Sequence, residues 1–204
     1  MPEYTIHGGA EGKRRLEILS RTIGPGTDRF LKKAGISPGM NCLDLGCGSG
    51  DVTMAMAALV GVYGHVLGVD LDEHKIQSAN ASVQQRDIKN AGFKTFNAYD
   101  LKDESAYEVV YSRFLLSHLS KPEDVLQKIA LALKTNGIIL IEDTDFSGHF
   151  CSPASSDFNS YVNLYQRLLK KRSADANLGQ QLVFLLKKTG FVDVQFQISG
   201  LVEC

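Results

Sequence analysis

From residue 41 onward, short apolar runs alternate with longer amphipathic stretches. Short apolar or alternating runs predict strands, and apolar side chains three and four positions apart predict helices. The predicted strands are 41–45, 65–69, 93–98, 107–111, 137–142 and 192–198. The predicted helices are 51–60, 73–90, 122–134, 154–171 and 178–188.

Strands and helices that take turns in this way are typical of βαβ units. The sequence therefore predicts an α/β fold of the Rossmann-like, doubly wound kind, with a mainly parallel sheet and helices on both faces. Ligands of such sheets bind outside the carboxyl ends of the strands, near the switch in strand order. We therefore expect the functional residues in the loops that follow the strands.

Upstream of the first strand, residues 12–23 predict a helix. Gly24-Pro25-Gly26 is expected to interrupt it, and Thr27 is expected to cap a second helix.

The loop after the first strand, Asp44-Leu45-Gly46-Cys47-Gly48-Ser49-Gly50-Asp51, has three glycines at alternate positions. Glycines between a strand and a helix let the backbone turn tightly and approach a ligand closely. A dinucleotide fingerprint has Gly or Ala where this chain has Asp51, whose carboxylate is expected to cap the helix and to repel a pyrophosphate. A ligand with an ammonium and a sulfonium, such as adenosylmethionine, has no such conflict. We expect Asp44 to hold its ammonium, directly or through water.

Acidic residues also end the next two predicted strands. Asp70 is expected to accept hydrogen bonds from both ribose hydroxyls, with Leu71 on one face of the adenine and Asp72 capping the following helix. Asp100 is expected to accept from the adenine amino group, with Leu101 closing the other side of the ring. A simple turn role for Asp100 stays open, because Asp is common in turns.

Taken together, these segments resemble the class I S-adenosylmethionine-dependent methyltransferases, in the bacterial small-molecule, methyltransferase type 11 or UbiE-like branch. The residues that carry the resemblance are Leu43 to Gly50, Gly68-Val69-Asp70, Asp100, Val109 to Leu119 and Leu133 to Asp143, within 40–145. The resemblance implies S-adenosyl-L-methionine as the cofactor and a cofactor-lining segment after the fourth strand. The expected cofactor-binding residues are Asp44, Gly46, Cys47, Gly48, Gly50, Asp70, Leu71, Asp100, Leu101, Ser112 and Arg113.

The same resemblance implies how the rest of the chain is organised. Residues 1–35 are expected to form a helical cap over the cofactor, with Tyr4 and Gly8-Gly9 as a lid. Residues 36–204 are expected to form the Rossmann-like methyltransferase domain, so that the chain is a single domain overall. The family sheet usually has seven strands, but only six residues follow the predicted strand 192–198. Either the seventh strand is absent or the chain is shortened.

Methyl transfer from a sulfonium is an in-line displacement whose rate comes mostly from positioning, and a base is needed only if the acceptor must lose a proton. The candidates for that base are His149, His118, Asp145, Asp143 and Tyr4. A helix role is the alternative for His118, and a surface or cap role is the alternative for the two aspartates. Arg113 is expected to pair with the cofactor carboxylate or to form a structural salt bridge. No Asn-Pro-Pro-Tyr or Asp-Pro-Pro-Tyr segment follows the fourth strand, which disfavours methylation of base or amide nitrogen. No Asp occupies the first positions after that strand, so no metal is expected.

Composition adds the last constraints. The net charge of −1 gives no reason to expect nucleic acid or a membrane surface as a partner, and Lys170-Lys171-Arg172 is expected to be the solvated end of a helix. The four cysteines form no C-x-x-C pair, and the N-terminus has no signal-peptide pattern, so a reduced, cytoplasmic setting is expected. The sequence favours methyl transfer to an unidentified small molecule. A noncatalytic cofactor-binding module and an NAD-dependent oxidoreductase are the alternatives, and the oligomeric state stays open.

Overall fold

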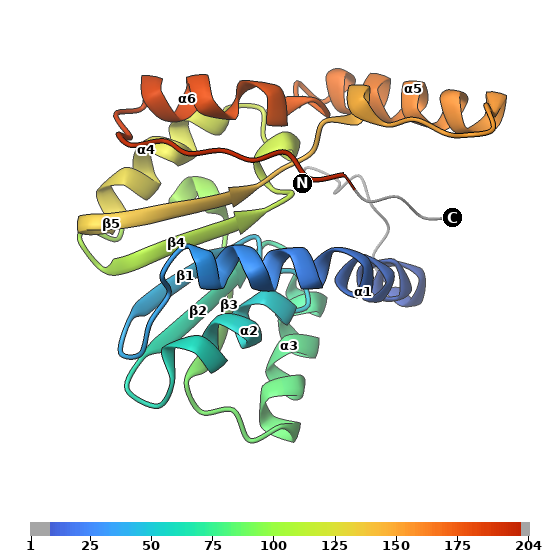
Figure 1. Cartoon of the computed structure of the whole chain (residues 1–204). Coiled ribbons are helices and arrows are strands. Elements are labelled where there is room, and N and C mark those ends of the chain that lie inside the picture. The colour runs from blue at the N-terminus through green and yellow to red at the C-terminus, as the bar shows by residue number, and fades with distance from the viewer. Residues whose placement is uncertain (1–8, 201–204) are drawn as a thin grey trace.

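Five parallel strands form one sheet, in the order β3-β2-β1-β4-β5, in the computed structural model, which describes residues 9–200 (Figure 1). The strands are β1 (Asn41–Leu45), β2 (His65–Asp70), β3 (Ala91–Thr95), β4 (Tyr107–Arg113) and β5 (Leu133–Glu142). Strand order reverses at β1, so that β1 and β4 flank the switch point at which ligands of doubly wound sheets bind. The expected Rossmann-like α/β fold is confirmed.

Helices cover both faces of this sheet (Figure 1). α1, α2 and α3 lie on one face, α4 and α6 lie on the other, and α5 extends beyond the sheet. Their bounds are α1 (Gly9–Lys33), α2 (Asp51–Val60), α3 (Glu73–Gln85), α4 (Pro122–Ala132), α5 (Ser156–Lys171) and α6 (Leu182–Lys188). Four 3₁₀ turns complete the described elements: η1 (Ala98–Asp100), η2 (Leu116–His118), η3 (Phe146–Gly148) and η4 (Leu178–Gln181).

The sheet separates two hydrophobic cores. Successive residues of a strand point to opposite faces, so β1 contributes Leu43 to the cluster that contains Leu126 of α4, and Cys42 to the cluster that contains Met56 of α2. Leu126 and Met56 are fully buried. Burial of each such side chain stabilises the fold by about 1.5–3 kcal/mol, which fixes the helices against the strands and holds the loops between them in place.

The expected strand at 192–198 is wrong. This segment belongs to no strand, and Val192 and Ile198 are 82% and 92% exposed. Its alternating pattern gives it strand propensity, but a strand forms only where a neighbour satisfies its backbone N–H and C=O groups. Among the described residues, the sheet therefore ends at β5.

The expected break at Gly24-Pro25-Gly26 is also wrong, because α1 runs through it with Pro25 inside the helix. Thr27 consequently caps no second helix and is a buried residue within α1. Leu31, one turn later, is fully buried in the core beside α2. Packing of this face against the sheet outweighs the local propensity for a break. The expected lid residues Tyr4 and Gly8 lie outside the described residues.

Element boundaries moved by a few residues elsewhere. The helix expected over 73–90 ends at Gln85, and β3 begins at Ala91. The turn expected before the fifth strand lies inside β5, where the register with β4 shifts and Asn136 has φ +63°. Asn tolerates this left-handed backbone better than most residues, so the turn chemistry produces a bulge.

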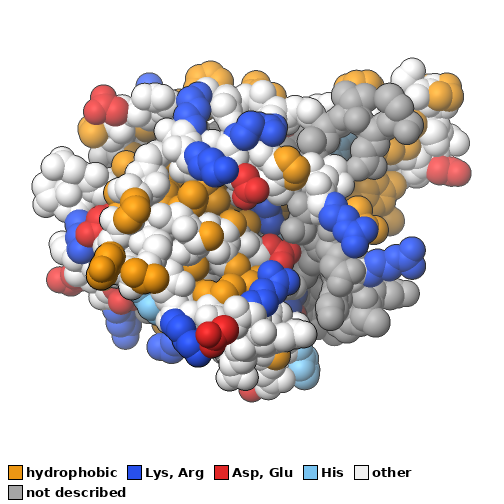
Figure 2. Space-filling view, turned by 60° about the horizontal axis from the view of Figure 1, so that its bottom comes forward, with side chains coloured by type: hydrophobic (Ala, Val, Ile, Leu, Met, Phe, Trp, Pro, Cys, Tyr) orange, Lys and Arg blue, Asp and Glu red, His pale blue; other side chains and the backbone are white. Residues whose placement is uncertain are grey.

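The molecular surface mixes charges of both signs. On the face shown in Figure 2, Lys and Arg side chains are interspersed with Asp and Glu. No helix within residues 9–200 is long and apolar enough to cross a membrane. Across the same described residues, no group of three or more His, Cys, Asp or Glu is arranged to hold a metal ion.

Candidate functional site

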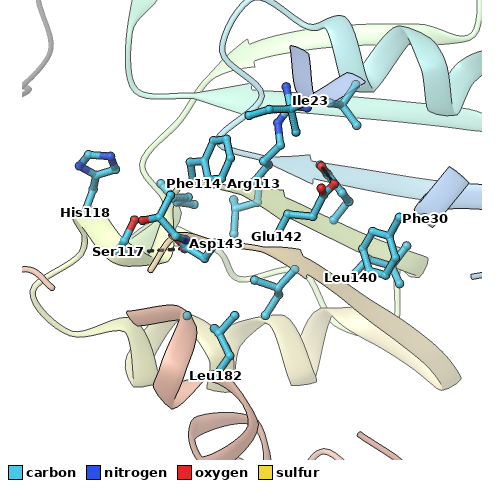
Figure 3. Close-up of a pocket in the computed structure, with 18 of the residues that line it drawn as sticks. Ile23, Phe30, Arg113, Phe114, Ser117, His118, Leu140, Glu142, Asp143 and Leu182 are labelled. Carbon is cyan, nitrogen blue, oxygen red and sulfur yellow. Dashed lines mark hydrogen bonds between the residues drawn. The ribbon is translucent and has the colours of Figure 1, made fainter. Parts of the chain in front are cut away.

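A long groove follows the carboxyl ends of the strands, where the sequence places the functional loops. Its walls come from α1, from the loops after β1, β2, β4 and β5, and from α5. Figure 3 shows the part beside β4 and β5, with Glu142 between Arg113 and Leu140 and with Asp143 facing Ser117. Seven of the expected cofactor residues line the groove: Asp44, Gly46, Cys47, Gly48, Asp70, Leu71 and Arg113.

Asp44 is a buried carboxylate at the base of the groove. It is 1% exposed, and its Oδ2 accepts a hydrogen bond of 2.6 Å from the hydroxyl of Thr53. Burial raises the pKa of Asp44 to about 6, against the lowering effects of the Thr53 hydrogen bond and of Arg113. Burying an ion without a matching charge is unfavourable, so this carboxylate favours a cationic ligand group in the groove.

Asp70 holds the glycine loop in place. Its Oδ2 accepts from the backbone N–H of Gly48 at 2.9 Å, and its Oδ1 accepts from the N–H of Asp72 at 2.9 Å. Asp72 in turn accepts from His74 and Lys75 as the N-cap of α3, which confirms its expected role. The carboxylate of Asp70 therefore joins the loop after β1 to the loop after β2.

The glycines of the loop serve different purposes. Gly48 has φ +55°, and a Cβ placed there would meet nothing within 4 Å, so its backbone faces open space. Gly50 has φ +81° and does not line the groove, and its Cβ would lie 2.5 Å from the Phe93 ring. Gly50 is also the N-cap of α2, without a side-chain bond, while Asp51 is the first residue of the helix. The expected capping role of Asp51 is therefore wrong.

Three other expected cofactor residues lie away from the groove. Asp100 is exposed at the end of η1, and Leu101 is 3% exposed within the core that contains α4. Ser112 is buried and donates to the carbonyl of Leu45 at 3.0 Å. None of the three lines the groove, whereas Tyr99 of η1 does.

A polar chain crosses from α1 to the ends of β4 and β5. Arg113 Nη1 donates to Thr27 Oγ1 at 3.1 Å, and Thr27 donates to Glu142 Oε2 at 3.1 Å. Tyr111 donates to Glu142 Oε1 at 2.6 Å. Burial and the adjacent Glu142 raise the pKa of Tyr111, so its hydroxyl keeps its proton and remains a donor. Phe114, the residue after Arg113, has φ +54°, which turns the chain sharply toward η2.

Asp143 fixes the short helix that carries His118. Its Oδ2 accepts from the N–H of Ser117 at 3.0 Å (Figure 3). Its Oδ1 accepts from the N–H of Thr144 at 2.8 Å. Burial raises the pKa of Asp143, although these hydrogen bonds act to lower it. His118 lines the groove and is half-buried. The carboxylate thus orients η2 relative to β5.

The remaining candidates for a base lie after β5. Asp145 caps η3: its Oδ1 accepts from Ser147 at 3.0 Å, and its Oδ2 accepts from Gln180 at 2.9 Å. Although burial opposes the shift, these hydrogen bonds lower the pKa of Asp145. His149 is exposed on the groove wall, 4.5 Å from the Phe146 ring centroid. Phe146 also stacks on Tyr165 of α5 at 4.2 Å, which forms an aromatic wall.

Comparison with known proteins agrees with this geometry. A family model described as a methyltransferase domain matches residues 36–192. The chain belongs to this methyltransferase family. Its relatives and its fold identify it as an S-adenosylmethionine-dependent, class I enzyme of the UbiE-like type.

Two curated relatives illustrate the range of the family. Demethylmenaquinone methyltransferase of Lactococcus lactis is 29% identical over 186 residues, covering 84% of this chain and 73% of that enzyme. Phosphoethanolamine N-methyltransferase 1 of Arabidopsis thaliana is 30% identical over 175 residues, covering 82% of this chain. This methyltransferase spans 32% of the length of the Arabidopsis protein.

Solved structures agree on the fold. The phosphoethanolamine N-methyltransferase 2 of Haemonchus contortus, solved with phosphomonomethylethanolamine and S-adenosylhomocysteine, has a TM-score of 0.65 and 26% identity. The match covers 82% of the methyltransferase described here and 37% of the Haemonchus chain. An S-adenosylmethionine-dependent methyltransferase from Aquifex aeolicus has a TM-score of 0.62 at 20% identity, covering 80% and 78% of the two chains, and shows the fold alone.

The groove of this methyltransferase fits the chemistry of S-adenosylmethionine. Two buried carboxylates, Asp44 and Asp70, flank a backbone segment that Gly48 leaves open. The loop from Gly46 to Asp51 contains no Lys or Arg that would favour a pyrophosphate. Carboxylates beside an open backbone suit an ammonium, a sulfonium and ribose hydroxyls.

The sequence did not indicate Thr27, Tyr111 and Glu142 as site residues. The position of Glu142 could have indicated it as a site residue, because it ends the fifth strand at the carboxyl edge of the sheet. Nothing in the sequence could have indicated Thr27, since its partner Glu142 is 115 residues away in the chain.

Proposed function

We propose that the loops after β1 and β2 bind S-adenosylmethionine and that the neighbouring groove presents a small-molecule acceptor to its methyl group. One observation carries the proposal: the buried carboxylates of Asp44 and Asp70 flank the open backbone of Gly48. Asp44 receives the ammonium group of the cofactor, and Asp70 receives the ribose hydroxyls. Leu71, which is half exposed on the groove wall, covers the adenine.

In this proposal four expected cofactor residues act at a distance, namely Gly50, Ser112, Asp100 and Leu101, whereas Arg113 acts from the groove. Gly50 admits the Phe93 ring, and Ser112 ties β4 to β1 through Leu45. Arg113 lies on the groove and serves the cofactor carboxylate from there, while one of its nitrogens donates to Thr27. Asp100 and Leu101 support η1, so that Tyr99 rather than Asp100 borders the adenine.

The acceptor lies toward β4, β5 and the aromatic wall of Phe146, His149 and Tyr165. The named acceptors of the relatives, demethylmenaquinone and phosphoethanolamine, are small molecules, which supports the same class here. His118 and His149 are the candidates for a proton acceptor at the groove. Asp145 borders the groove as well, but its two oxygens already accept hydrogen bonds from Ser147 and Gln180.

The chain contributes to the reaction by positioning and by excluding water. When bound, S-adenosylmethionine supplies an electrophilic methyl group. Asp44, Asp70 and the Gly48 backbone fix the direction in which that methyl points, and Leu115 and Phe114 line the side toward η2. Orientation of this kind supplies several kcal/mol of rate acceleration for a bimolecular transfer.

Calorimetry with S-adenosylmethionine, S-adenosylhomocysteine and NAD tests the cofactor. We expect binding of the first two and none of NAD; binding of NAD without S-adenosylhomocysteine would overturn the proposal. Labelled S-adenosylmethionine with a cell extract then tests transfer. We expect label in a small-molecule fraction, whereas a noncatalytic binding module would label nothing.

We also propose a cytoplasmic location. Three described cysteines, Cys42, Cys47 and Cys151, have free thiols, which suits a reducing compartment. Fractionation of cells that express the tagged chain tests this placement, and recovery in an oxidising compartment would contradict it.

A further inference from the structure

Sheet order divides the groove into two parts. The cofactor loops follow β1 and β2, and β4 and β5 lie on the other side of β1. Arg113 and Glu142 are opposite each other in the register at the ends of β4 and β5, and both line the groove. Glu142, at the end of the edge strand β5, therefore lies one strand further from the cofactor loops than Arg113 does (Figure 3).

The carboxylate of Glu142 is held in one orientation. Tyr111 donates to Oε1 and Thr27 donates to Oε2, and these donors are 0% and 2% exposed. A threonine hydroxyl has a single hydrogen. Because Thr27 gives that hydrogen to Glu142, it receives the donor of Arg113 on its lone pair. The chain thus runs in one direction, from Arg113 through Thr27 to Glu142.

Glu142 retains room to accept another hydrogen bond. Each carboxylate oxygen has two lone pairs, and each oxygen of Glu142 accepts one hydrogen bond, from Tyr111 or from Thr27. Asp143 also accepts one hydrogen bond on each oxygen, but both come from backbone N–H groups that hold η2 and the end of β5 in place. Asp145 accepts three, two from Ser147 and one from Gln180. Glu142 is half-buried beside the open groove, in contrast to its two donors.

We propose that Glu142 recognises the methyl acceptor by receiving a hydrogen bond from it, so that the acceptor presents an O–H or N–H group. This inference rests on the proposed function, since it places the acceptor beside the cofactor. Glu142 is then a specificity residue, and Tyr111 and Thr27 are positioning residues that aim its carboxylate. A hydrogen bond to a charged acceptor is about twice as strong as a neutral one, so Glu142 favours donors over their fully methylated counterparts.

Two matched probe pairs test this on the S-adenosylhomocysteine complex, by protein-observed NMR titration. Phenol and anisole differ by one O–H donor without a change in charge. Benzylamine, protonated at neutral pH, and N,N,N-trimethylbenzylammonium carry the same charge but differ in N–H donors. We expect the donor of at least one pair to bind roughly fivefold tighter or more, and Glu142→Gln to reduce that ratio below about twofold.

Calorimetry with S-adenosylhomocysteine on the same samples separates this inference from the proposed function. We expect Glu142→Gln to bind S-adenosylhomocysteine as the parent chain does. Absence of that binding in the parent chain would overturn the cofactor site itself. Glu108→Gln is the matched control, because Glu108 lies on β4 away from the groove and pairs with Lys134; it should keep the parent ratio.

Two results would overturn the role of Glu142. One is a parent complex that binds both members of each pair equally or binds none of the probes. The other is a Glu142→Gln complex that keeps the parent ratio. If Glu142→Gln does not fold, Glu142→Asp withdraws the carboxylate by one methylene and should likewise lower the ratio.

Discussion

The backbone N–H of Gly48 donates to the carboxylate of Asp70 at 2.9 Å, which joins the loops after β1 and β2. A residue that binds a ligand and also shapes the loop beneath it affects affinity in two ways. Under the proposed function, Asp70 therefore links the fold of the glycine loop directly to cofactor binding.

Asp70→Ala should weaken binding of S-adenosylhomocysteine by tenfold to a hundredfold. It removes the proposed ribose acceptor and leaves the N–H groups of Gly48 and Asp72 without their partner; hydrogen bonds to charged groups contribute about 1.5–3 kcal/mol. Titration calorimetry measures the change. Asp72→Ala is the neighbouring control: loss of the α3 cap should cost about 1 kcal/mol of stability and leave affinity within about twofold. Unchanged affinity in Asp70→Ala would remove Asp70 from the ribose role.

The raised pKa of Asp44 predicts that the folded chain loses stability as the pH rises. Its pKa is 3.8 before folding effects and about 6 in the fold, so the native state binds this proton more tightly than the unfolded state. The free energy of unfolding should fall between about pH 4 and pH 6 by roughly 3 kcal/mol from this group alone. Denaturant unfolding at a series of pH values measures it, and Asp44→Asn should remove this component of the slope.

Cofactor binding should have the opposite pH dependence at Asp44. The proposed ammonium ligand favours the ionised carboxylate, so affinity for S-adenosylhomocysteine should rise as the pH increases through about 6. Asp44→Asn should bind more weakly and lose this rise. A parent chain whose affinity stays constant from pH 5 to 7.5 would contradict the contact between Asp44 and the ammonium.

Alanine at two glycines should separate stability from binding. At Gly50 a Cβ would meet the Phe93 ring at 2.5 Å with φ +81°, so Gly50→Ala should lower the free energy of unfolding by about 2–4 kcal/mol. At Gly48 nothing lies within 4 Å, so Gly48→Ala should cost only the left-handed backbone energy of about 1–2 kcal/mol. Its methyl group would occupy the proposed ligand space and weaken S-adenosylhomocysteine binding at least tenfold. Equal affinity in Gly48→Ala and the parent would place the cofactor elsewhere.

Asp143→Ala should destabilise the loop that carries His118. It leaves the N–H groups of Ser117 and Thr144 without their acceptor, at a cost of about 1–3 kcal/mol for each if they stay buried. Hydrogen exchange should show faster exchange of the Ser117 amide, with the β1 and β2 amides unchanged. Asp145→Asn serves as the comparison, because it alters the adjacent η3 cap and should leave Ser117 protected.

Much of the proposed cofactor half of the groove was predictable from sequence, for a physical reason. Carboxyl ends of parallel strands meet at one edge, so Asp44 and Asp70, each at or near a strand end, had to converge there. Asp72 was predictable as a cap because capping depends on the next three residues. The same reasoning from strand ends also selected Asp100, Leu101 and Ser112. The side chain of Asp100 faces solvent, and those of Leu101 and Ser112 are buried. A shift of one residue along the chain decides whether a side chain faces the groove, the core or solvent.

Only the tertiary structure decided the half of the groove in which we propose the acceptor. The local sequence predicts the end of a helix near Pro25, yet burial of Thr27 and Leu31 keeps α1 continuous. The alternation at 192–198 satisfied the local rules for a strand, but within residues 9–200 no strand pairs with it. The contact between Thr27 and Glu142 spans 115 positions and follows no spacing. Periodicity and strand ends are properties of neighbouring residues, so the sequence by itself determined the fold and the cofactor loops. Which side chains meet across the groove depends on how α1 packs on the sheet, and that packing is determined by the whole chain.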